Sequence, residues 1–320
     1  MNNYYLGIDT SAYTTSIGVI DNNGEIVFDK RNVLKVKEGE KGLRQQEAVF
    51  QHINNLPILI SEMTKNIDVA KIRTISASSK PRDIEGSYMP VFVVGKEQAF
   101  ILSKILNVPF KEFSHQEGHI SAGVLSNCFM ERNRFIAVHL SGGTTELWYV
   151  ENNANFEIKL IGGTLDISVG QLIDRIGVKL GFKFPCGKEM DSISQKGNIL
   201  FSKVPVSTEK TWANFSGTEN FFVKHIEANK FGTNDIIKTL FYTIGLSILN
   251  MVLAACSEYD IDDVLIIGGV ASNSFIRDFI TKDLNKYNIN VVFPNKELCS
   301  DNAIGTAYLG KLKNGHVWRK

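Results

Sequence analysis

A strand–turn–strand pattern occurs twice in this chain, and it limits the folds that the chain can adopt. The first copy turns at Ser11, and the second copy turns at Ser141. When these two serines are aligned without a gap, threonines, asparagines and apolar residues fall at matching positions on both sides. Separate hairpins can share turn chemistry, but a match of this length favours a duplicated unit. Two such meanders, with polar tips facing each other across a cleft, suit the binding of phosphates by backbone N–H groups.

Predicted strands and helices alternate through the rest of the chain. We expect strands at residues 4–9, 14–20, 25–34, 72–77, 110–113, 135–140, 144–150, 263–267 and 289–293. We expect helices at residues 43–65 (with a kink or break at Pro57), 94–106, 115–128, 166–180, 188–196, 233–258, 273–286 and 301–313. Residues 199–218 have no regular pattern. The alternation predicts α/β units.

Composition is that of a soluble globular protein in a reducing compartment. The formal net charge of +1 gives no overall attraction to nucleic acid. Asp9 interrupts the first apolar run, so we expect no signal peptide. The apolar segment 241–256 is short and contains polar residues, which favours a buried helix over a membrane span. The cysteines are far apart in the sequence, which argues against disulfides: Cys128, Cys186, Cys256 and Cys299. We expect a cytoplasmic location and no membrane.

Two histidines, His115 and His119, are four residues apart on a predicted helix. Positions i and i+4 lie on one helix face, so both imidazoles can reach a single metal ion. The same spacing also occurs by chance on solvated helix faces. Asp301, at the predicted start of the last helix, is either a helix cap or a third ligand. In the second case the three residues form a two-histidine, one-carboxylate site, and sequence spacing does not decide between these roles.

The histidine pair differs from the zinc-peptidase pattern in which glutamate follows the first histidine and acts as the base. That position holds Gln116, which cannot take a proton. Glu117 is about 200° around the helix from both histidines. We therefore expect no peptidase activity.

A glycine pair, Gly268 and Gly269, ends a buried predicted strand, and Asn273 follows at a helix start. Such a turn lets a ligand lie on the backbone, and a helix N-terminus favours anions. For Asn273 the alternative is a plain helix cap. Asp166, Gly170 and Asp174 lie at four-residue steps, which would place them on one helix face. We expect Asp174 to accept hydrogen bonds from ribose hydroxyls, unless this face is merely solvated.

Together these motifs resemble the threonylcarbamoyl-transferase family (TsaD-like), once called O-sialoglycoprotein endopeptidases. The matching segments lie in the family's order along nearly the whole chain: residues 6–11, 115–119, 140–143, Asp174, 268–273 and 299–302. The resemblance implies an actin-like ATPase (ASKHA) fold of two duplicated α/β lobes with a nucleotide cleft between them. It also implies transfer of threonylcarbamoyl from its AMP anhydride to a tRNA adenosine beside the anticodon.

The resemblance also implies ligands, residues and partners. One divalent metal, iron or zinc, would bind His115, His119 and Asp301. An adenine nucleotide or acyl-adenylate would contact His139, Leu140, Ser141, Gly142, Gly143, Asp174, Gly187 and Asn273, beside Gly268 and Gly269. Asp9 and Ser11 are the candidate catalytic residues. We expect one lobe at residues 1–113 plus 302–320 and the other at 114–301. The expected partners are tRNA, a TsaB-like paralogue and a TsaE-like ATPase.

Several loops depart from the family pattern. Thr144 stands where the family has histidine, and residues 12–15 and 79–82 replace the family's Cys-Asp-Glu-Thr and Gly-Pro-Gly sequences. Gln171 and residues 185–188 differ as well. The metal and nucleotide residues are kept, whereas loops near the acceptor change. Two alternatives therefore stay open: a carbamoyltransferase with another acceptor, or a non-catalytic nucleotide-binding paralogue that scaffolds a partner.

Overall fold

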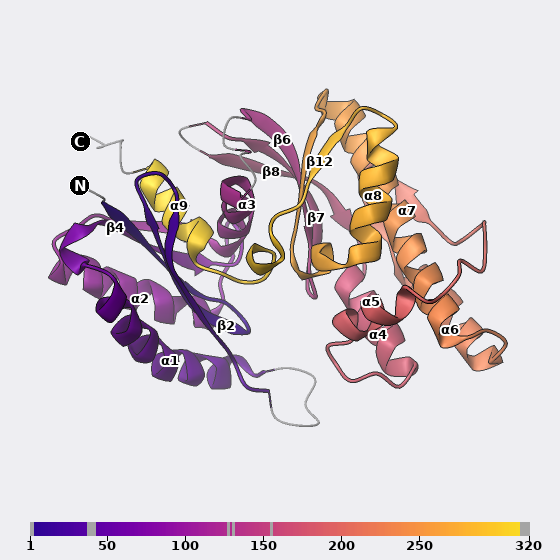
Figure 1. Cartoon of the computed structure of the whole chain (residues 1–320), viewed down its shortest axis with the longest axis horizontal. Coiled ribbons are helices and arrows are strands. Elements are labelled where there is room, and N and C mark those ends of the chain that lie inside the picture. Colours follow the sequence, from indigo (N-terminus) through magenta and orange to yellow (C-terminus); the bar gives the residue numbers. More distant parts are fainter. Residues whose placement is uncertain (1–2, 37–42, 127–128, 130–131, 154–155, 314–320) are drawn as a thin grey trace. The chain divides into compact units, whose positions relative to one another are not determined.

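The chain forms two compact units in the computed structural model, which describes residues 3–36, 43–126, 129, 132–153 and 156–313 (Figure 1). Unit 1 comprises Met1–Met130 and Ser300–Lys320. Unit 2 comprises Glu131–Cys299. Each unit is built on its own mixed β-sheet.

The sheet of unit 1 has five strands in the order β3-β2-β1-β4-β5. Their bounds are Tyr4–Thr10 (β1), Thr14–Asp21 (β2), Ile26–Val33 (β3), Ile72–Lys80 (β4) and Phe110–Ser114 (β5). The first three strands form an antiparallel meander, and β4 and β5 continue the sheet in parallel. Thr10 pairs with Thr15, so residues 11–14 form the tip of the first hairpin.

Helices cover both faces of this sheet. Their bounds are Gln45–Asn66 (α1), Pro90–Ile105 (α2), His115–Ser126 (α3) and Ile304–Leu312 (α9), with a short 3-10 helix at Val69–Lys71. Figure 1 shows α1 and α2 on one side of the sheet and α3 and α9 on the other. Strands β1 and β2 are buried along almost their whole length, because side chains on both faces are covered. Helix α1 runs through Pro57 as one continuous helix.

The sheet of unit 2 repeats this arrangement. Its order is β12-β11-β6-β7-β8-β10-β9. The bounds are Arg134–Leu140 (β6), Thr145–Glu151 (β7), Glu157–Thr164 (β8), Ser207–Glu209 (β9), Trp212–Asn214 (β10), Asp263–Ile267 (β11) and Asn290–Val292 (β12). Strands β6, β7 and β8 form the meander, and β11 and β12 extend it in parallel beyond β6. The duplication predicted from the sequence is therefore present in the sheet order, with β9 and β10 added at one edge.

The helices of unit 2 pack around one long buried helix. They are Val169–Lys179 (α4), Gly187–Ser194 (α5), Ser216–Ala228 (α6), Thr233–Tyr259 (α7) and Ser274–Asn285 (α8), with 3-10 helices at Gly269–Ser272 and Lys296–Leu298. Among the residues described, α7 is the one helix long and apolar enough to cross a membrane, but 72% of its apolar window is buried within the protein. It serves as the core helix of unit 2, as its polar interruptions predicted.

Several element bounds differ from those predicted. Strand β8 was not predicted, and α6 begins inside the region expected to be irregular. Helix α2 starts at Pro90, α4 at Val169 and α9 at Ile304. The predicted helix end at 127–128 lies outside the described residues. The division into units also differs from the expected lobes at residues 114–130 and 300–301, which belong to unit 1 because α3 packs against α9, β4 and β5.

Candidate metal centre and nucleotide-binding residues

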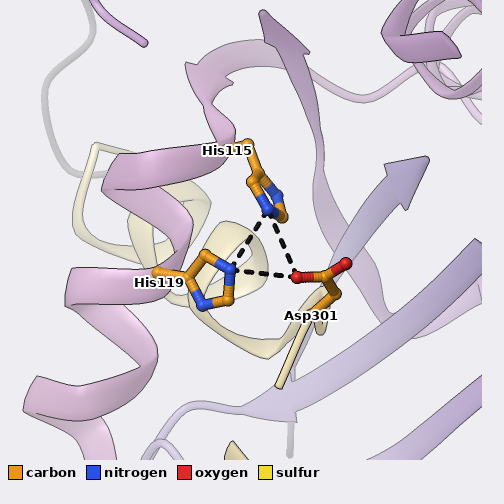
Figure 2. Close-up of side chains that lie close together, drawn as sticks. All are labelled: His115, His119 and Asp301. Atoms are coloured by element: carbon orange, nitrogen blue, oxygen red, sulfur yellow. Dashed lines mark hydrogen bonds and ion pairs between the residues drawn. The ribbon is translucent and has the colours of Figure 1, made fainter. Parts of the chain in front are cut away.

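Three side chains of unit 1 bring metal-binding atoms together (Figure 2). The Nε2 atoms of His115 and His119 are 3.1 Å apart. Asp301 Oδ1 lies 3.2 Å from Nε2 of His119 and 3.5 Å from Nε2 of His115. The two histidines predicted from the helix spacing and the predicted carboxylate therefore lie together.

Helix α3 presents the two histidines because its first turn is fixed by a reciprocal cap. The Ser114 hydroxyl accepts from the N–H of Glu117 at 3.1 Å, and Glu117 Oε2 accepts from the N–H of Ser114 at 2.6 Å. This is a capping box. It holds the Glu117 carboxylate at the helix start, so the expectation that Glu117 points away from the histidines is consistent with its contacts.

Two roles were expected for Asp301, a helix cap or a third metal ligand. The structure does not show the first, because Asp301 does not cap helix α9. It precedes the helix, and Asn302 Oδ1 accepts from the N–H of Ile304 at 3.0 Å instead. Oδ2 of Asp301 accepts a hydrogen bond of 2.7 Å from the Ser11 hydroxyl. The Asp301 carboxylate is therefore held by Ser11 on one oxygen while the other faces the histidines.

Asp9 orients the imidazole of His115 through the ring nitrogen that faces away from His119 and Asp301. His115 donates its Nδ1–H to Asp9 Oδ1 at 2.8 Å, which leaves Nε2 to face His119 and Asp301. A carboxylate on the second nitrogen of a ligating histidine sets its tautomer and orientation. Asp9 is fully buried, and its Oδ2 has no hydrogen-bond partner among the described residues. Both candidate catalytic residues, Asp9 and Ser11, thus contact a member of the cluster.

The carboxylates of Asp9 and Asp301 favour a positive charge between them. Burial opposes a charged imidazole, but the carboxylates of Asp9 and Asp301 overcome it and raise the pKa of His115 to about 10. Burial likewise opposes ionisation of Asp301, but hydrogen bonds from His115 and His119 hold its pKa well below its usual range. Two imidazole nitrogens and one carboxylate oxygen suit a divalent transition metal. The donor set therefore fits a metal, which would replace the proton on His115.

In unit 2, the tip of the β6–β7 hairpin carries the first group of predicted nucleotide residues. The Ser141 N–H donates to Thr144 O at 2.8 Å, and the Ser141 hydroxyl accepts from the Thr144 N–H at 3.0 Å. A side chain placed on Gly142 or Gly143 would meet no atom within 4 Å. The backbone of this tip is therefore open to a ligand. Gly170 of α4 packs directly beneath it, because a Cβ there would lie 2.4 Å from Ser141 O.

The Gly268–Gly269 turn lies against the end of β6. Gly268 has a φ of 98°, which favours glycine, and a Cβ there would come within 2.3 Å of Leu140 O and 2.8 Å of a His139 ring carbon. Gly269 has open space at its Cβ position. The structure thus brings His139, Leu140 and the glycine turn together.

Asp174 and Gly187 are linked through Cys186. Asp174 Oδ1 accepts from the Cys186 N–H at 2.8 Å, and Gly187 begins helix α5 next to it. Burial raises the pKa of Asp174. The prediction that Asp166 and Asp174 lie on one helix face is wrong, because α4 starts three residues after Asp166. Its carboxylate instead accepts from the N–H groups of Phe215 and Ser216, at the start of α6.

Asn273 caps helix α8, as its alternative role predicted: its Oδ1 accepts from the Ile276 N–H at 2.9 Å. The same helix end is also bonded by Asp191, whose Oδ2 accepts from the Ser274 N–H at 2.9 Å. The chain's own carboxylate thus occupies this N-terminus, where the sequence predicted an attraction for anions. Asp191 was missed because it is distant in sequence and has no motif around it.

The sequence of the chain matches a known family over most of its length. A model of the family of tRNA N6-adenosine threonylcarbamoyltransferases (TsaD) matches residues 28–308. The chain belongs to the TsaD family. A relative from Sulfurihydrogenibium sp., described as a tRNA N6-adenosine threonylcarbamoyltransferase, is 30% identical over 311 residues, which cover 95% of this chain and 89% of the relative. The membership predicted from the motifs is confirmed, and the family's chemistry is acyl transfer.

Solved structures support the predicted actin-like ATPase fold. HypF from T. kodakarensis aligns with a TM-score of 0.66 and 16% identity, over 97% of this chain and 47% of HypF. A ROK family glucokinase from Streptomyces griseus aligns with a TM-score of 0.56 and 12% identity, over 97% of this chain and 99% of the glucokinase. At these identities the likeness shows the fold alone, which agrees with the duplicated sheets of this TsaD-family chain.

Proposed function

We propose that this chain is a metal-dependent transferase that moves threonylcarbamoyl from threonylcarbamoyl-AMP to an adenosine of tRNA. The observation that carries the proposal is the convergence of His115, His119 and Asp301 in a chain that matches the TsaD family over residues 28–308. In this reaction the adenosine amine forms a bond to the carbamoyl carbon. The bond from that carbon to the phosphate oxygen breaks, AMP leaves and the amine loses a proton.

One divalent ion, iron or zinc, is the proposed cofactor of unit 1, held by His115, His119 and Asp301. When bound, such an ion supplies a Lewis acid that polarises the carbamoyl carbonyl and accepts donor oxygens. Asp9 keeps Nε2 of His115 directed at the site by accepting the proton of Nδ1. Ser11 holds the Asp301 carboxylate by its hydroxyl. These two residues therefore orient ligands.

The adenylate part of the donor is the proposed ligand of unit 2. Gly142 and Gly143 offer exposed backbone at the hairpin tip, which suits phosphate oxygens. Gly269 and Gly187 have open space at their Cβ positions, which suits a base and ribose that lie on the backbone, and Gly268 forms the turn that precedes Gly269. Asp174 keeps one oxygen on the Cys186 N–H, and its second oxygen is the proposed acceptor for ribose hydroxyls. The proposed contact of Asn273 uses the side chain that also caps α8.

Partners and location follow from the same proposal. A TsaB-like paralogue and a TsaE-like ATPase are the proposed protein partners, because the family works with them. The proposed location is the cytoplasm, where tRNA and the ATP-derived donor are made. The buried core position of α7 supports a protein that is not held in a membrane.

The loop changes favour one second candidate: the same donor chemistry with another acceptor. Thr144 replaces the family histidine, and residues 79–82 carry charged residues in place of the family's Gly-Pro-Gly loop. Residues on cleft-facing loops change specificity more readily than scaffold residues do. A non-catalytic scaffold is the further outcome if donor binding occurs without transfer.

The test is reconstitution with tRNA, threonine, bicarbonate, ATP, the adenylate-making enzyme and this protein, with and without the two partners. Mass spectrometry of the digested tRNA should reveal threonylcarbamoyladenosine in the complete mixture. The matched control carries His115→Ala, which should give none. Donor binding without modified nucleoside would point to another acceptor or a scaffold, and no donor binding would remove the transferase proposal.

A further inference from the structure

His52 is a buried polar residue on the inner face of helix α1. The other buried residues of this helix are apolar or small: Ala48, Leu56, Leu59 and Met63. The His52 side chain is 0% exposed, so each of its nitrogens needs a partner within the protein. Both partners come from one short stretch of chain, the β1–β2 hairpin.

The two hydrogen bonds of His52 hold both ends of the hairpin tip. Nε2 lies 2.8 Å from the Ser11 carbonyl oxygen, and Nδ1 lies 2.8 Å from the Thr15 hydroxyl. A carbonyl only accepts, so Nε2 carries the proton and Nδ1 accepts from the Thr15 hydroxyl. Burial lowers the pKa of His52, which keeps the ring neutral and this pattern fixed. Asn55 donates to the same hydroxyl at 3.2 Å.

The tip held by His52 carries the hydroxyl that binds Asp301. Ser11 has a single hydroxyl proton, and the nearest acceptor is Asp301 Oδ2 at 2.7 Å, compared with 3.3 Å to Thr14 O. His52 is thus joined to the Asp301 carboxylate through one residue. A shift of the Ser11 backbone would move the hydroxyl and release the carboxylate, which is 28% exposed and precedes its helix.

We propose that His52 is a positioning residue of the metal site, which sets the orientation of Asp301 by fixing the Ser11 backbone. The inference rests on the metal site proposed above, but it concerns a residue that contacts no predicted metal ligand. Through His52, helix α1 would support metal binding without supplying a ligand. Residues that hydrogen-bond a metal ligand directly, as Ser11 does with Asp301, typically contribute 10- to 100-fold to affinity. His52 acts through Ser11, so its loss should weaken binding by about tenfold, the lower end of that range.

The test measures zinc and cobalt affinity by chelator competition for the whole protein and its variants. His52→Phe removes both hydrogen bonds and fills the space, and we expect affinity to fall about tenfold. His52→Gln keeps an N–H within reach of the Ser11 carbonyl and should retain most of the affinity. His52→Asn is too short for that carbonyl and should behave as His52→Phe does.

A double-mutant cycle separates positioning from general stability. Ser11→Ala should weaken binding to a similar extent, and the double variant with His52→Phe should lose little more, because both changes break one path. The control is His225→Phe on α6 in unit 2, where Nδ1 lies 2.8 Å from Phe221 O. It should leave metal affinity unchanged whatever its effect on melting temperature.

The outcomes distinguish this inference from the proposed function. Wild-type protein that binds no metal would overturn both. Wild-type binding with unchanged affinity in folded His52→Phe, or losses that add in the cycle, would overturn the positioning role and leave the metal site standing. If His52→Phe does not fold, equal affinities of His52→Gln and His52→Asn would overturn it instead.

Discussion

A side-chain carbon on Gly305 would lie 1.8 Å from the carbonyl oxygen of Gly118. Gly118 lies between the two histidines on α3, and Gly305 is the second residue of α9, shortly after Asp301. The two helix backbones therefore touch at a pair of glycines. This contact brings the segment with the histidines next to the segment with the carboxylate, so the metal-type cluster depends on the absence of a side chain at Gly305; at Gly118 a Cβ would meet the Thr306 hydroxyl at 3.0 Å.

Gly305→Ala should therefore separate α3 from α9 and disturb the cluster. Because the obstacle is backbone, we expect a loss of about 1–3 kcal/mol in the free energy of unfolding, as overpacked cores show, together with weaker metal binding. Chemical denaturation and chelator competition measure the two effects. Gly217→Ala on α6 is the matched control, since a Cβ there meets nothing within 4 Å. An unchanged Gly305→Ala variant would contradict the argument.

The same contact explains what the sequence could predict of the site. The spacing of His115 and His119 follows from helix periodicity, which is a local property. The role of Asp301 was left open because it depends on where α9 packs, which is a tertiary property. The links from Asp191 to α8 and from His52 to Ser11 were not foreseen for the same reason: each joins residues from separate elements and lies in no recognised motif.

The fold was predictable where periodicity and turns are strong. The first meander, the first two strands of the second meander and the strand–helix alternation were found, as were the long helix α7 and the cap Asn273. Helix α6 was missed although Ser216 and Glu219 have the spacing of a capping box. In the structure its N-cap position is Phe215, which makes no side-chain cap, and the N–H groups at its start are bonded by the distant Asp166. Strand β8 was missed because Gly162 and Gly163 weaken its pattern.

Removal of one histidine of the proposed metal site should abolish metal binding. His119→Ala deletes one of the three donor atoms, and bound metal should fall to background in elemental analysis of the purified protein. Asp9→Asn should lower affinity by about 10- to 100-fold, because it alters the partner of His115 Nδ1. His225→Ala, in unit 2, serves as the control. Full metal content in His119→Ala would eliminate the site.

An adenine nucleotide should stabilise unit 2. At a concentration of about 100 times Kd, ATP or AMP should add about 2.7 kcal/mol to the free energy of unfolding, seen as a higher melting temperature. Asp174→Ala should reduce this increase, because it removes the proposed ribose acceptor. It also frees the Cys186 N–H, so each variant is compared with its own nucleotide-free melting curve. The absence of any shift at millimolar nucleotide would count against the site.

Asp166 should make stability depend on pH in the acid range. Partial burial opposes its charge, but hydrogen bonds from Phe215, Ser216 and Ile167 lower its pKa to about 2 from an ordinary 3.8. A lowered folded-state pKa stabilises fully above the unfolded value, and the effect is lost as pH falls from about 4 to 2. Asp166→Asn should cost about 1 kcal/mol at neutral pH, a figure reduced for solvent exposure, and should flatten this dependence.

Denaturation curves at pH 7, 4 and 2.5 measure the effect of Asp166→Asn. Asp278→Asn on α8 is the control, because Asp278 is an exposed carboxylate that should matter little. Equal stability losses for Asp166→Asn at every pH would show that the anchor at the start of α6 does not depend on the charge.

The metal-loaded protein should not cleave peptides, although its histidine pair resembles that of zinc peptidases. A peptidase base must reach the water at the metal. Gln116 cannot accept a proton, and the Glu117 carboxylate is bonded to the Ser114 N–H at 2.6 Å and to the Ser114 hydroxyl at 2.8 Å. Burial also raises the pKa of Glu117, but its carboxylate stays bonded to Ser114 in the helix cap.

Casein and glycoprotein substrates should stay intact over a long incubation with zinc or iron. Cleavage that requires metal and disappears in His115→Ala would overturn this prediction, whereas cleavage that persists in His115→Ala would come from a contaminant.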